Sequence, residues 1–340
     1  MRESIVIINN EKCVVKKNDI YCQNIEIKSI SEALDKNFDI SLILRKSNIN
    51  PIHKINIIKT KISSNIISFI SNIIKNLKNK KKFFIISITP YTFIAFVILI
   101  LFRKKIYLYL RSNGIDEYRL ILGKQFVWVY RLMLYLMSKG SNVLCVNDKI
   151  LPNKNYILVL PSQINEPWLQ KRENTSLNRI KLLYVGRIKI EKGVFSLLKL
   201  SKELNSKLPH TLTLVGHGKK INNLMENVKL LNPVTKSDDL IKIYDQHNIS
   251  ILPSFTEGHP QVLLESLARK RPIIIFEDIS YVNKNYEGVF VAKRNSEDLG
   301  KIINYVIENY HKISLAMDKN TLPSKSMFIK DLTHYLSSSI

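Results

Sequence analysis

The stretch from Pro253 to Ala268, "PSFTEGHPQVLLESLA", carries two glutamates, Glu257 and Glu265, on either side of a helix start. It overlaps the apolar run "NISILPS", which has the composition of a buried strand, and Pro260 suits the first position of the helix that follows. A strand, a polar loop and a helix in this order are typical of open α/β sheets. In such sheets ligands bind at the carboxyl ends of the strands.

The two glutamates flank a helix N-terminus, which attracts phosphate through its free N–H groups. Carboxylates do not bind phosphate, but they accept hydrogen bonds from hydroxyl groups. A pair of carboxylates around an anion site therefore suits a ligand that has both groups, such as a nucleotide sugar. The plainer alternative is that Glu257 and Glu265 are surface residues beside a helix start.

Two upstream segments also have the form of a strand that runs into a glycine-containing loop. "LLYVGRIKIEKGVFSLL" places Arg187 and Lys192 in a short loop, where two cations would neutralise a phosphate group. The alternative is a solvated loop with a salt bridge to Glu191. "LTLVGHGKK" brings Gly216 into a similar loop, where glycine either lets a ligand approach the backbone or simply turns the chain.

The segments "GRIKIEKG", "LVGHG" and "SFTEGHPQVLLESLARKRPII", in this order and spacing, resemble the C-terminal domain of glycosyltransferase family 4. This is a retaining family with the GT-B fold, and the resemblance extends over residues 180–315. It implies that Arg187 and Lys192 hold the donor pyrophosphate and stabilise the departing nucleotide. It further implies that Glu257 faces the donor sugar and Glu265 the ribose hydroxyls.

The same resemblance completes the expected donor site with Gly216, Gly258 and His259. Arg187, Lys192 and Glu257 are the expected catalytic residues. The N-terminal half resembles the family less. Its segment "LYLRSNGIDEYR" supplies Arg111 and Asn113 as candidate acceptor contacts, with a purely structural role as the alternative.

The whole chain alternates short β-branched runs with longer helical stretches, which is typical of α/β proteins with parallel sheets. Together with the resemblance, this predicts a GT-B fold in which two Rossmann-like domains face each other across a cleft. We expect an acceptor-side domain over residues 1–165, a linker over 166–178 and a nucleotide-sugar-binding domain over 179–318. The last segment, 319–340, could form a helix that packs back on the N-terminal domain.

The segment "FFIISITPYTFIAFVILILF", residues 83–102, is long and apolar enough to cross a membrane. The alternative interpretation divides it at Pro90 into a buried strand and a helix, with "KKIYLYLRS" as the next strand. The regular spacing of the neighbouring β-type runs favours this strand–helix–strand unit.

The net charge of +24, from 52 Lys and Arg against 28 Asp and Glu, favours anionic partners. No acidic residue lies between Asp39 and Asp116. The helix-like pattern over Ile66, Ile70, Ile73 and Leu77 precedes several lysines, so it could lie on an anionic membrane or pack on its own sheet. Basic residues of this region include Arg45, Lys46, Lys75, Lys78, Lys80, Lys81, Lys82, Arg103, Lys104, Lys105 and Arg111.

The cysteines Cys13, Cys22 and Cys145 do not have the spacing of metal ligands. They are also too few, and odd in number, for a disulfide framework. The N-terminus lacks the apolar run of a signal peptide. These features predict a cytoplasmic protein, and the basic N-terminal half adds the inner face of the membrane as an expected location.

The family resemblance implies transfer of a sugar, with retention, from a nucleoside diphosphate to a glycan or lipid-diphosphate-linked acceptor in surface polysaccharide biosynthesis. No D-x-D motif occurs, so we expect neither a metal ion nor another cofactor. The alternatives are an inactive GT-B relative that acts as a membrane-associated partner subunit and a GT-B sugar-nucleotide epimerase. Nucleic acid is not an expected partner, because no zinc spacing or RNA-binding motif is present.

Overall fold

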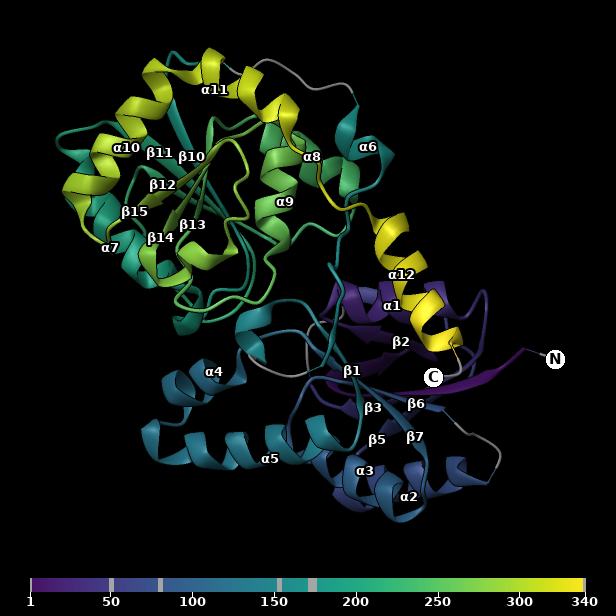
Figure 1. Cartoon of the computed structure of the whole chain (residues 1–340). Helices are drawn as coiled ribbons and strands as arrows, with labels where there is room; N and C mark the ends of the chain where they lie inside the picture. The colour runs from purple at the N-terminus through teal and green to yellow at the C-terminus, as the bar shows by residue number, and fades with distance from the viewer. Residues whose placement is uncertain (1, 49–51, 79–81, 152–154, 171–175, 339–340) are drawn as a thin grey trace. The chain divides into compact units, whose positions relative to one another are not determined.

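The computed structural model describes residues 2–48, 52–78, 82–151, 155–170 and 176–338. The chain forms two compact units, each with its own buried core (Figure 1). The first comprises Met1–Leu160 and Ser326–Ile340, and the second comprises Pro161–Lys325.

The first unit is built on a mostly parallel sheet. Its parallel strands follow the order β5-β3-β1-β6-β7-β8-β9, so the winding of the chain reverses at the β1–β6 boundary, as in doubly wound Rossmann folds. The central strand is fully buried from Ile5 to Ile8, as expected where helices cover both faces. These strands are β1 (Ser4–Lys16), β3 (Asp39–Lys46), β5 (Thr60–Ser63), β6 (Lys82–Ile86), β7 (Lys105–Leu110), β8 (Asn142–Cys145) and β9 (Ile157–Leu158).

Strand β1 continues well beyond the run "SIVIINN" that the sequence indicates. Its second half forms an antiparallel hairpin with β2 (Asp19–Cys22), and β4 (His53–Ile55) pairs with β2. Lys17 and Asn18 between the paired strands both have positive φ, which is the geometry of a tight two-residue hairpin turn.

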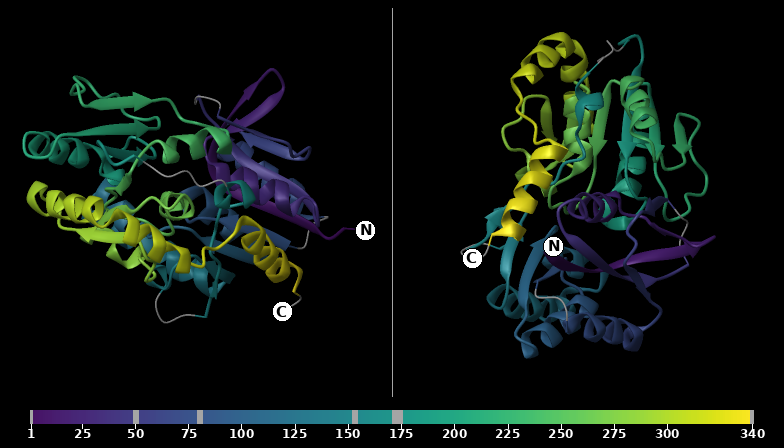
Figure 2. Two further views of the ribbon diagram at one scale, coloured as in Figure 1. Left: turned by 90° about the horizontal axis from the view of Figure 1, so that it is seen from above. Right: turned by 90° about the vertical axis from the view of Figure 1, so that its right-hand side faces the viewer.

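The helices of the first unit include one from the far end of the chain. Helix α12, yellow in Figure 2, lies with the purple and blue elements of the first unit, and its Phe328, Leu332 and Leu336 belong to that unit's core. Lys82 Nζ also donates a hydrogen bond to Leu336 O at 2.8 Å. The helices are α1 (Ile25–Leu34), α2 (Ile66–Leu77), α3 (Pro90–Leu101), α4 (Gly114–Ile121), α5 (Val127–Lys139) and α12 (Lys325–Ser337), with 3-10 turns η1 (Lys124–Phe126) and η2 (Asp148–Ile150).

The apolar segment 83–102 forms strand β6 and helix α3, as the strand–helix–strand interpretation predicts. Thr89 caps α3 through its side chain. Pro90 occupies the first turn, where its missing N–H costs nothing because an N–H at this position would have no intrahelical partner. Among the described residues, no helix combines the length and apolar character that a membrane crossing requires.

Helix α2 packs on its own sheet through part of its apolar surface, while Ile67 and Ile74 remain exposed. Ile73 and Leu77, on the face predicted from the sequence, are buried in the core of the first unit. Lys82, one of the basic residues of this region, is also buried and forms an ion pair with Glu3. Two others, Lys80 and Lys81, lie outside the described residues.

The second unit has a six-stranded, wholly parallel sheet in the order β12-β11-β10-β13-β14-β15, again the doubly wound order (Figure 1). Its strands are β10 (Ile180–Val185), β11 (His210–Val215), β12 (Val228–Leu231), β13 (Ile249–Leu252), β14 (Ile273–Phe276) and β15 (Val289–Ala292). Its helices are α6 (Glu166–Leu169), α7 (Val194–Asn205), α8 (Ser237–Asp245), α9 (Gln261–Ala268), α10 (Ser296–Glu308) and α11 (Tyr310–Ala316), with 3-10 turns η3 (Ile190–Lys192), η4 (Glu277–Val282) and η5 (Met317–Lys319).

The stretch 166–178, favoured as a linker by its polar composition, begins with the packed helix α6. Trp168 of this helix is 2% exposed and stacks edge-on against Tyr244. Residues 171–175 of this stretch lie outside the described residues.

Candidate donor site in the second unit

The switch point of the second sheet lies between β10 and β13, where the winding reverses. Ligands of doubly wound sheets bind at this point, beyond the carboxyl ends of the strands. The loop after β10 carries Arg187 and Lys192, and the loop after β13 carries Glu257. The fold therefore brings these loops, far apart in the sequence, to the same end of two neighbouring strands.

Backbone hydrogen bonds join the loops after β10 and β11. Ile188 N donates to His217 O, and Lys219 N donates to Ile188 O, both at 2.8 Å. A Cβ atom at Gly216 would lie 1.8 Å from Gly186 O. Glycine at 216 is thus required by the close approach of the two backbone segments that follow β10 and β11.

The loops after β10 and β13 are in contact through their backbones as well. Phe255 N donates to Glu191 O at 3.0 Å. Gly193 has φ +67°, and a Cβ there would lie 1.8 Å from Pro253 O. A side chain at this position would therefore separate the loop that carries Lys192 from the loop that carries Glu257.

Lys192 and Glu257 form an ion pair at the switch point, with Nζ 2.6 Å from Oε1. The two side chains are only 21% and 11% exposed. Ser254 Oγ donates to the same Oε1 at 2.6 Å, and Tyr281 OH donates to Glu257 O at 2.7 Å. A cation and a carboxylate are thus held together in a fixed, largely buried position.

Arg187 has an exposed side chain and lies in the same loop as Lys192. Its carbonyl oxygen accepts a hydrogen bond from Tyr184 OH at 2.7 Å, which fixes the backbone just beyond β10. Burial lowers the pKa of His217, and the charges of Arg187 and Lys189 lower it further. The loops after β10 and β11 therefore present positive charge without a protonated histidine.

Glu265 lies inside α9 and is buried, contrary to the interpretation of both glutamates as surface residues. Tyr244 OH donates to its Oε2 at 2.8 Å. Burial raises the pKa of Glu265 from 4.5 to about 7, while the hydrogen bond from Tyr244 lowers it. The carboxyl group is thus poised to change charge near neutral pH.

The loop "FTEGHP" has buried polar atoms that lack a partner within the described part of the chain. These atoms are Thr256 Oγ1 and His259 Nε2. Burial lowers the pKa of His259 to about 4, so the ring is neutral at pH 7. The ring also bonds to the Pro161 backbone, which can only accept because proline has no N–H. The bonded nitrogen is therefore Nδ1–H, and Nε2 is an acceptor.

Pro260 precedes α9 as its N-cap residue, one position before the helical position predicted for it. No side chain caps the N-terminus of this helix by a hydrogen bond. Since the first N–H groups of a helix have no intrahelical partner, this end retains its capacity to bind an anion.

Arg294, which sequence reasoning missed, braces the loop that carries Glu257. Its Nη1 donates to Pro253 O at 3.0 Å, and its Nη2 lies 2.6 Å from Asp278 Oδ2. The guanidinium also lies over the Phe255 ring, 4.1 Å from the centroid. No local pattern marks this arginine, because its partners are remote in the sequence.

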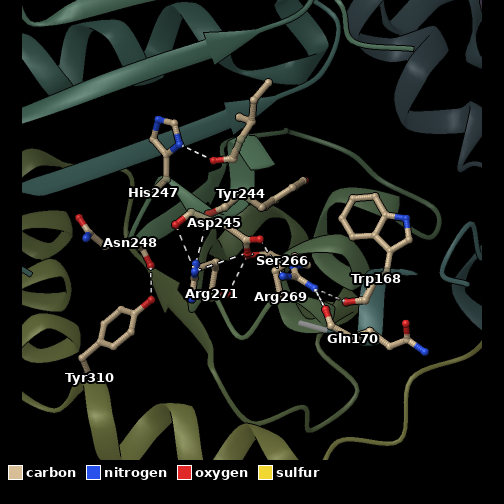
Figure 3. A network of polar contacts seen from close by, with 11 residues as sticks. Trp168, Gln170, Tyr244, Asp245, His247, Asn248, Ser266, Arg269, Arg271 and Tyr310 are labelled. Carbon is tan, nitrogen blue, oxygen red and sulfur yellow. Dashed lines mark hydrogen bonds and ion pairs between the residues drawn. The ribbon is translucent and has the colours of Figure 1, made fainter. Parts of the chain in front are cut away.

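A buried ionic network supports α9 from its C-terminal end (Figure 3). Arg269 binds both carboxylate oxygens of Asp245, at 2.9 and 2.7 Å, and donates to Trp168 O at 2.9 Å. Arg271 donates to the backbone of Asp245 and Tyr244, at 3.2 Å in each case. The network thereby ties α9 to α8 and α6.

The candidate acceptor residues lie in the first unit. Arg111 Nη2 pairs with Glu26 Oε2 at 2.8 Å, and Tyr109 OH donates to the other oxygen of Glu26 at 3.0 Å. Asn113 caps α4, since its Oδ1 accepts from Ile115 N at 3.2 Å. Asn113 therefore has a structural role, whereas Arg111 is a positioned cation whose Nε lacks a partner among the described residues.

No group of three or more His, Cys, Asp or Glu side chains with metal-binding geometry occurs among the described residues. The three cysteines are buried thiols.

Glu265→Gln should change how stability depends on pH. The folded-state pKa of Glu265 lies above the ordinary value, so the stability that its neutral form contributes is fully present below pH 4.5 and is lost as the pH rises through 7. Glutamine stays neutral, so we expect the loss between pH 5 and 8 to shrink by about 2–3 kcal/mol. Urea unfolding at both pH values measures this. The exposed Glu203→Gln should keep the wild-type profile, and an unchanged profile in Glu265→Gln would contradict the assignment.

The sequence of residues 166–322 matches the family described as glycosyl transferases group 1. An uncharacterized glycosyltransferase of Haemophilus influenzae is 29% identical over 175 residues, covering 48% of this chain and 50% of the relative. The N,N'-diacetylbacillosaminyl-diphospho-undecaprenol alpha-1,3-N-acetylgalactosaminyltransferase of Campylobacter jejuni is 25% identical over 220 residues, covering 61% and 57%. The aligned stretches thus span about half the length of these curated relatives.

Similarity to solved structures extends over the whole chain. Anabaena HepE in complex with UDP matches with a TM-score of 0.70 at 12% identity, covering 98% of this chain and 99% of HepE. At such identity the likeness shows the fold. The chain has the GT-B fold of glycosyltransferases, as predicted, and the similarity to group 1 glycosyl transferases lies in residues 166–322.

Proposed function

We propose that this chain is a retaining glycosyltransferase. It would move a sugar from a nucleoside-diphosphate donor to a glycan or lipid-diphosphate-linked acceptor in bacterial surface polysaccharide biosynthesis. The observation that carries the proposal is the Lys192–Glu257 ion pair, held by the loops that meet at the switch point of the second sheet. A nucleoside-diphosphate sugar needs a fixed cation for its phosphates and a fixed hydrogen-bond acceptor for its sugar hydroxyls. Lys192 offers the first and Glu257 the second.

Positive charge in the site stabilises the leaving group. As the bond from the sugar to the diphosphate breaks, negative charge develops on the diphosphate, and preorganised cations lower the energy of that state. Lys192 and the exposed Arg187 are assigned this role. Since fixed side-chain cations supply this charge, the reaction is proposed to need no metal ion, and activity in the presence of a chelator tests this.

Hydroxyl recognition is assigned to the loop after β13 and to α9. Glu257 would accept hydrogen bonds from the donor sugar and Glu265 from the ribose. The neutral His259 offers Nε2 as a further acceptor, while Gly216 and Gly258 let the backbone approach the donor. A carboxylate at Glu265 is the better acceptor, so donor affinity should increase as the pH rises through 7.

The relatives support the donor and acceptor classes. HepE was solved with UDP, and the Campylobacter enzyme's name specifies a sugar attached to diphospho-undecaprenol. Both agree with a nucleotide donor and a lipid-diphosphate acceptor for this chain.

Calorimetric binding of a panel of nucleoside diphosphates and their sugars tests the proposal. We expect tight binding of one nucleotide, at least tenfold weaker in Arg187→Ala and Glu265→Ala. Transfer or slow hydrolysis of the corresponding sugar nucleotide would then show catalysis. Absence of binding to every member of the panel would refute the enzyme and favour an inactive partner subunit.

A further inference from the structure

Helix α5 of the first unit is apolar on two opposite faces. One face is buried through Val127, Tyr130, Met133, Leu134 and Met137. The other is solvent-exposed and carries Trp128, Leu132, Tyr135 and Leu136, of which Trp128 is 65% exposed. Their spacing places these four on one side of the helix, where a surface helix normally has polar residues.

The exposed face of α5 continues at both ends of the helix. Helix α4 packs beside α5 through Tyr118 and Tyr130, whose ring centroids lie 5.0 Å apart (Figure 1). The exposed residues Ile121, Leu122 and Phe126 connect the two helices. We call these three residues, together with Trp128, Leu132, Tyr135 and Leu136, the apolar ridge.

At the C-terminal end of α5, Gly140 lies against the side chains of Phe96 and Ile100 of α3. Helix α3 ends with the exposed residues Leu101 and Phe102. Exposed apolar surface of this extent is unusual on a water-facing surface and marks an interaction site.

The exposed charges of η1 and α5 are positive, whereas Asp116 and Glu117 lie half-buried in the first turn of α4. No acidic residue occurs between Glu117 and Asp148, while Lys124, Arg131 and Lys139 are exposed. Arg131 and Lys139 lie on the exposed side of α5, and Lys139 Nζ lies 4.5 Å from the Tyr135 ring centroid. Arg103 to Lys105 follow α3. A partner that matches this surface is apolar inside and negatively charged at its edge.

We propose that the apolar ridge docks on an anionic lipid bilayer. Trp and Tyr favour the membrane interface because they combine an apolar ring with a polar group, and Lys and Arg bind anionic headgroups. This places the membrane contact on α4, η1 and α5. On α2, Ile73 and Leu77 are buried, and the exposed Ile67 and Ile74 are not accompanied by exposed Trp or Tyr side chains. The proposal is independent of the donor chemistry, because the ridge belongs to the first unit and the donor-site residues to the second.

Vesicle flotation of the full chain tests the docking, with vesicles of phosphatidylcholine alone and of phosphatidylcholine with phosphatidylglycerol. We expect binding only to the anionic vesicles. Trp128→Ser with Leu132→Ser should reduce the affinity at least tenfold. Arg131→Gln and Lys139→Gln should each reduce it about fivefold, since a basic residue near an anionic leaflet contributes about 1 kcal/mol.

The matched control is Tyr305→Ser with Leu315→Ser, which removes two exposed apolar side chains from the second unit and should bind like the wild type. Circular dichroism and thermal melting verify that each variant folds. The proposal would be overturned if the wild type did not bind vesicles or bound neutral and anionic vesicles equally well. It would also be overturned if the ridge substitutions left the affinity unchanged. A wild-type dimer that the ridge substitutions dissociate, without vesicle binding, would also overturn it and identify the ridge as a self-association surface.

Discussion

Replacement of Lys192 by alanine is expected to lower kcat for sugar transfer by about 10²–10³. The substitution removes a fixed cation that would face the leaving diphosphate. It also leaves the largely buried Glu257 carboxylate without the ammonium group 2.6 Å away. Both effects weaken the side chains that are proposed to contact the donor. Steady-state release of the nucleoside diphosphate, with kcat and KM determined separately, measures the change.

Lys189→Ala is the matched control for Lys192→Ala. Lys189 lies in the same loop, but it is 46% exposed and its amino group is 3.5 Å from Glu191. A long ion pair whose lysine is solvent-exposed contributes little, so activity should stay within about twofold of the wild type. A wild-type kcat in Lys192→Ala, with folding verified by thermal melting, would contradict the role assigned to this lysine.

Asp245→Asn is expected to lower the free energy of unfolding by about 3–5 kcal/mol, because it leaves buried positive charge uncompensated. The guanidinium groups of Arg269 and Arg271, only 1% and 4% exposed, both contact Asp245 (Figure 3). Asparagine keeps the size of the side chain but cannot balance either charge. Urea unfolding at neutral pH, followed by circular dichroism, measures the loss.

Asp318→Asn provides the comparison for Asp245→Asn. Its carboxylate pairs with Lys270, but it is 49% exposed, so water replaces the lost interaction. The expected cost is below about 1 kcal/mol. If the two substitutions had equal effects, the buried network would not contribute to stability as inferred here.

Much of the fold follows from the sequence because strand and helix signals are local. The runs at β10, β11, β13 and β14 are short, rich in β-branched residues and separated by helical spacing, so their identity does not depend on remote contacts. The same holds for α3, where Pro90 marks the helix start inside a continuous apolar segment. The resemblance to glycosyltransferase family 4, which predicted the GT-B fold, also rests on short local motifs.

The candidate site could be predicted as residue types but not as contacts. The sequence places Lys192, Glu257 and Glu265 in loops or helices of the right kind. It does not show that Lys192 pairs with Glu257, that Tyr244 buries Glu265, or that Arg294 braces the loop. Each contact joins segments at least 21 residues apart, so it depends on strand order.

The sequence by itself determined the α/β class, most strands and helices, and the residues of the candidate donor site, because these depend on local periodicity and motif spacing. Only the tertiary structure decided which apolar faces are buried. It buried Ile73 and Leu77 of α2, packed Trp168 of α6 and left Trp128 of α5 exposed. Periodicity identifies an apolar face of a helix. Whether that face is buried depends on which elements pack against it, and the long-range order of the strands determines those neighbours.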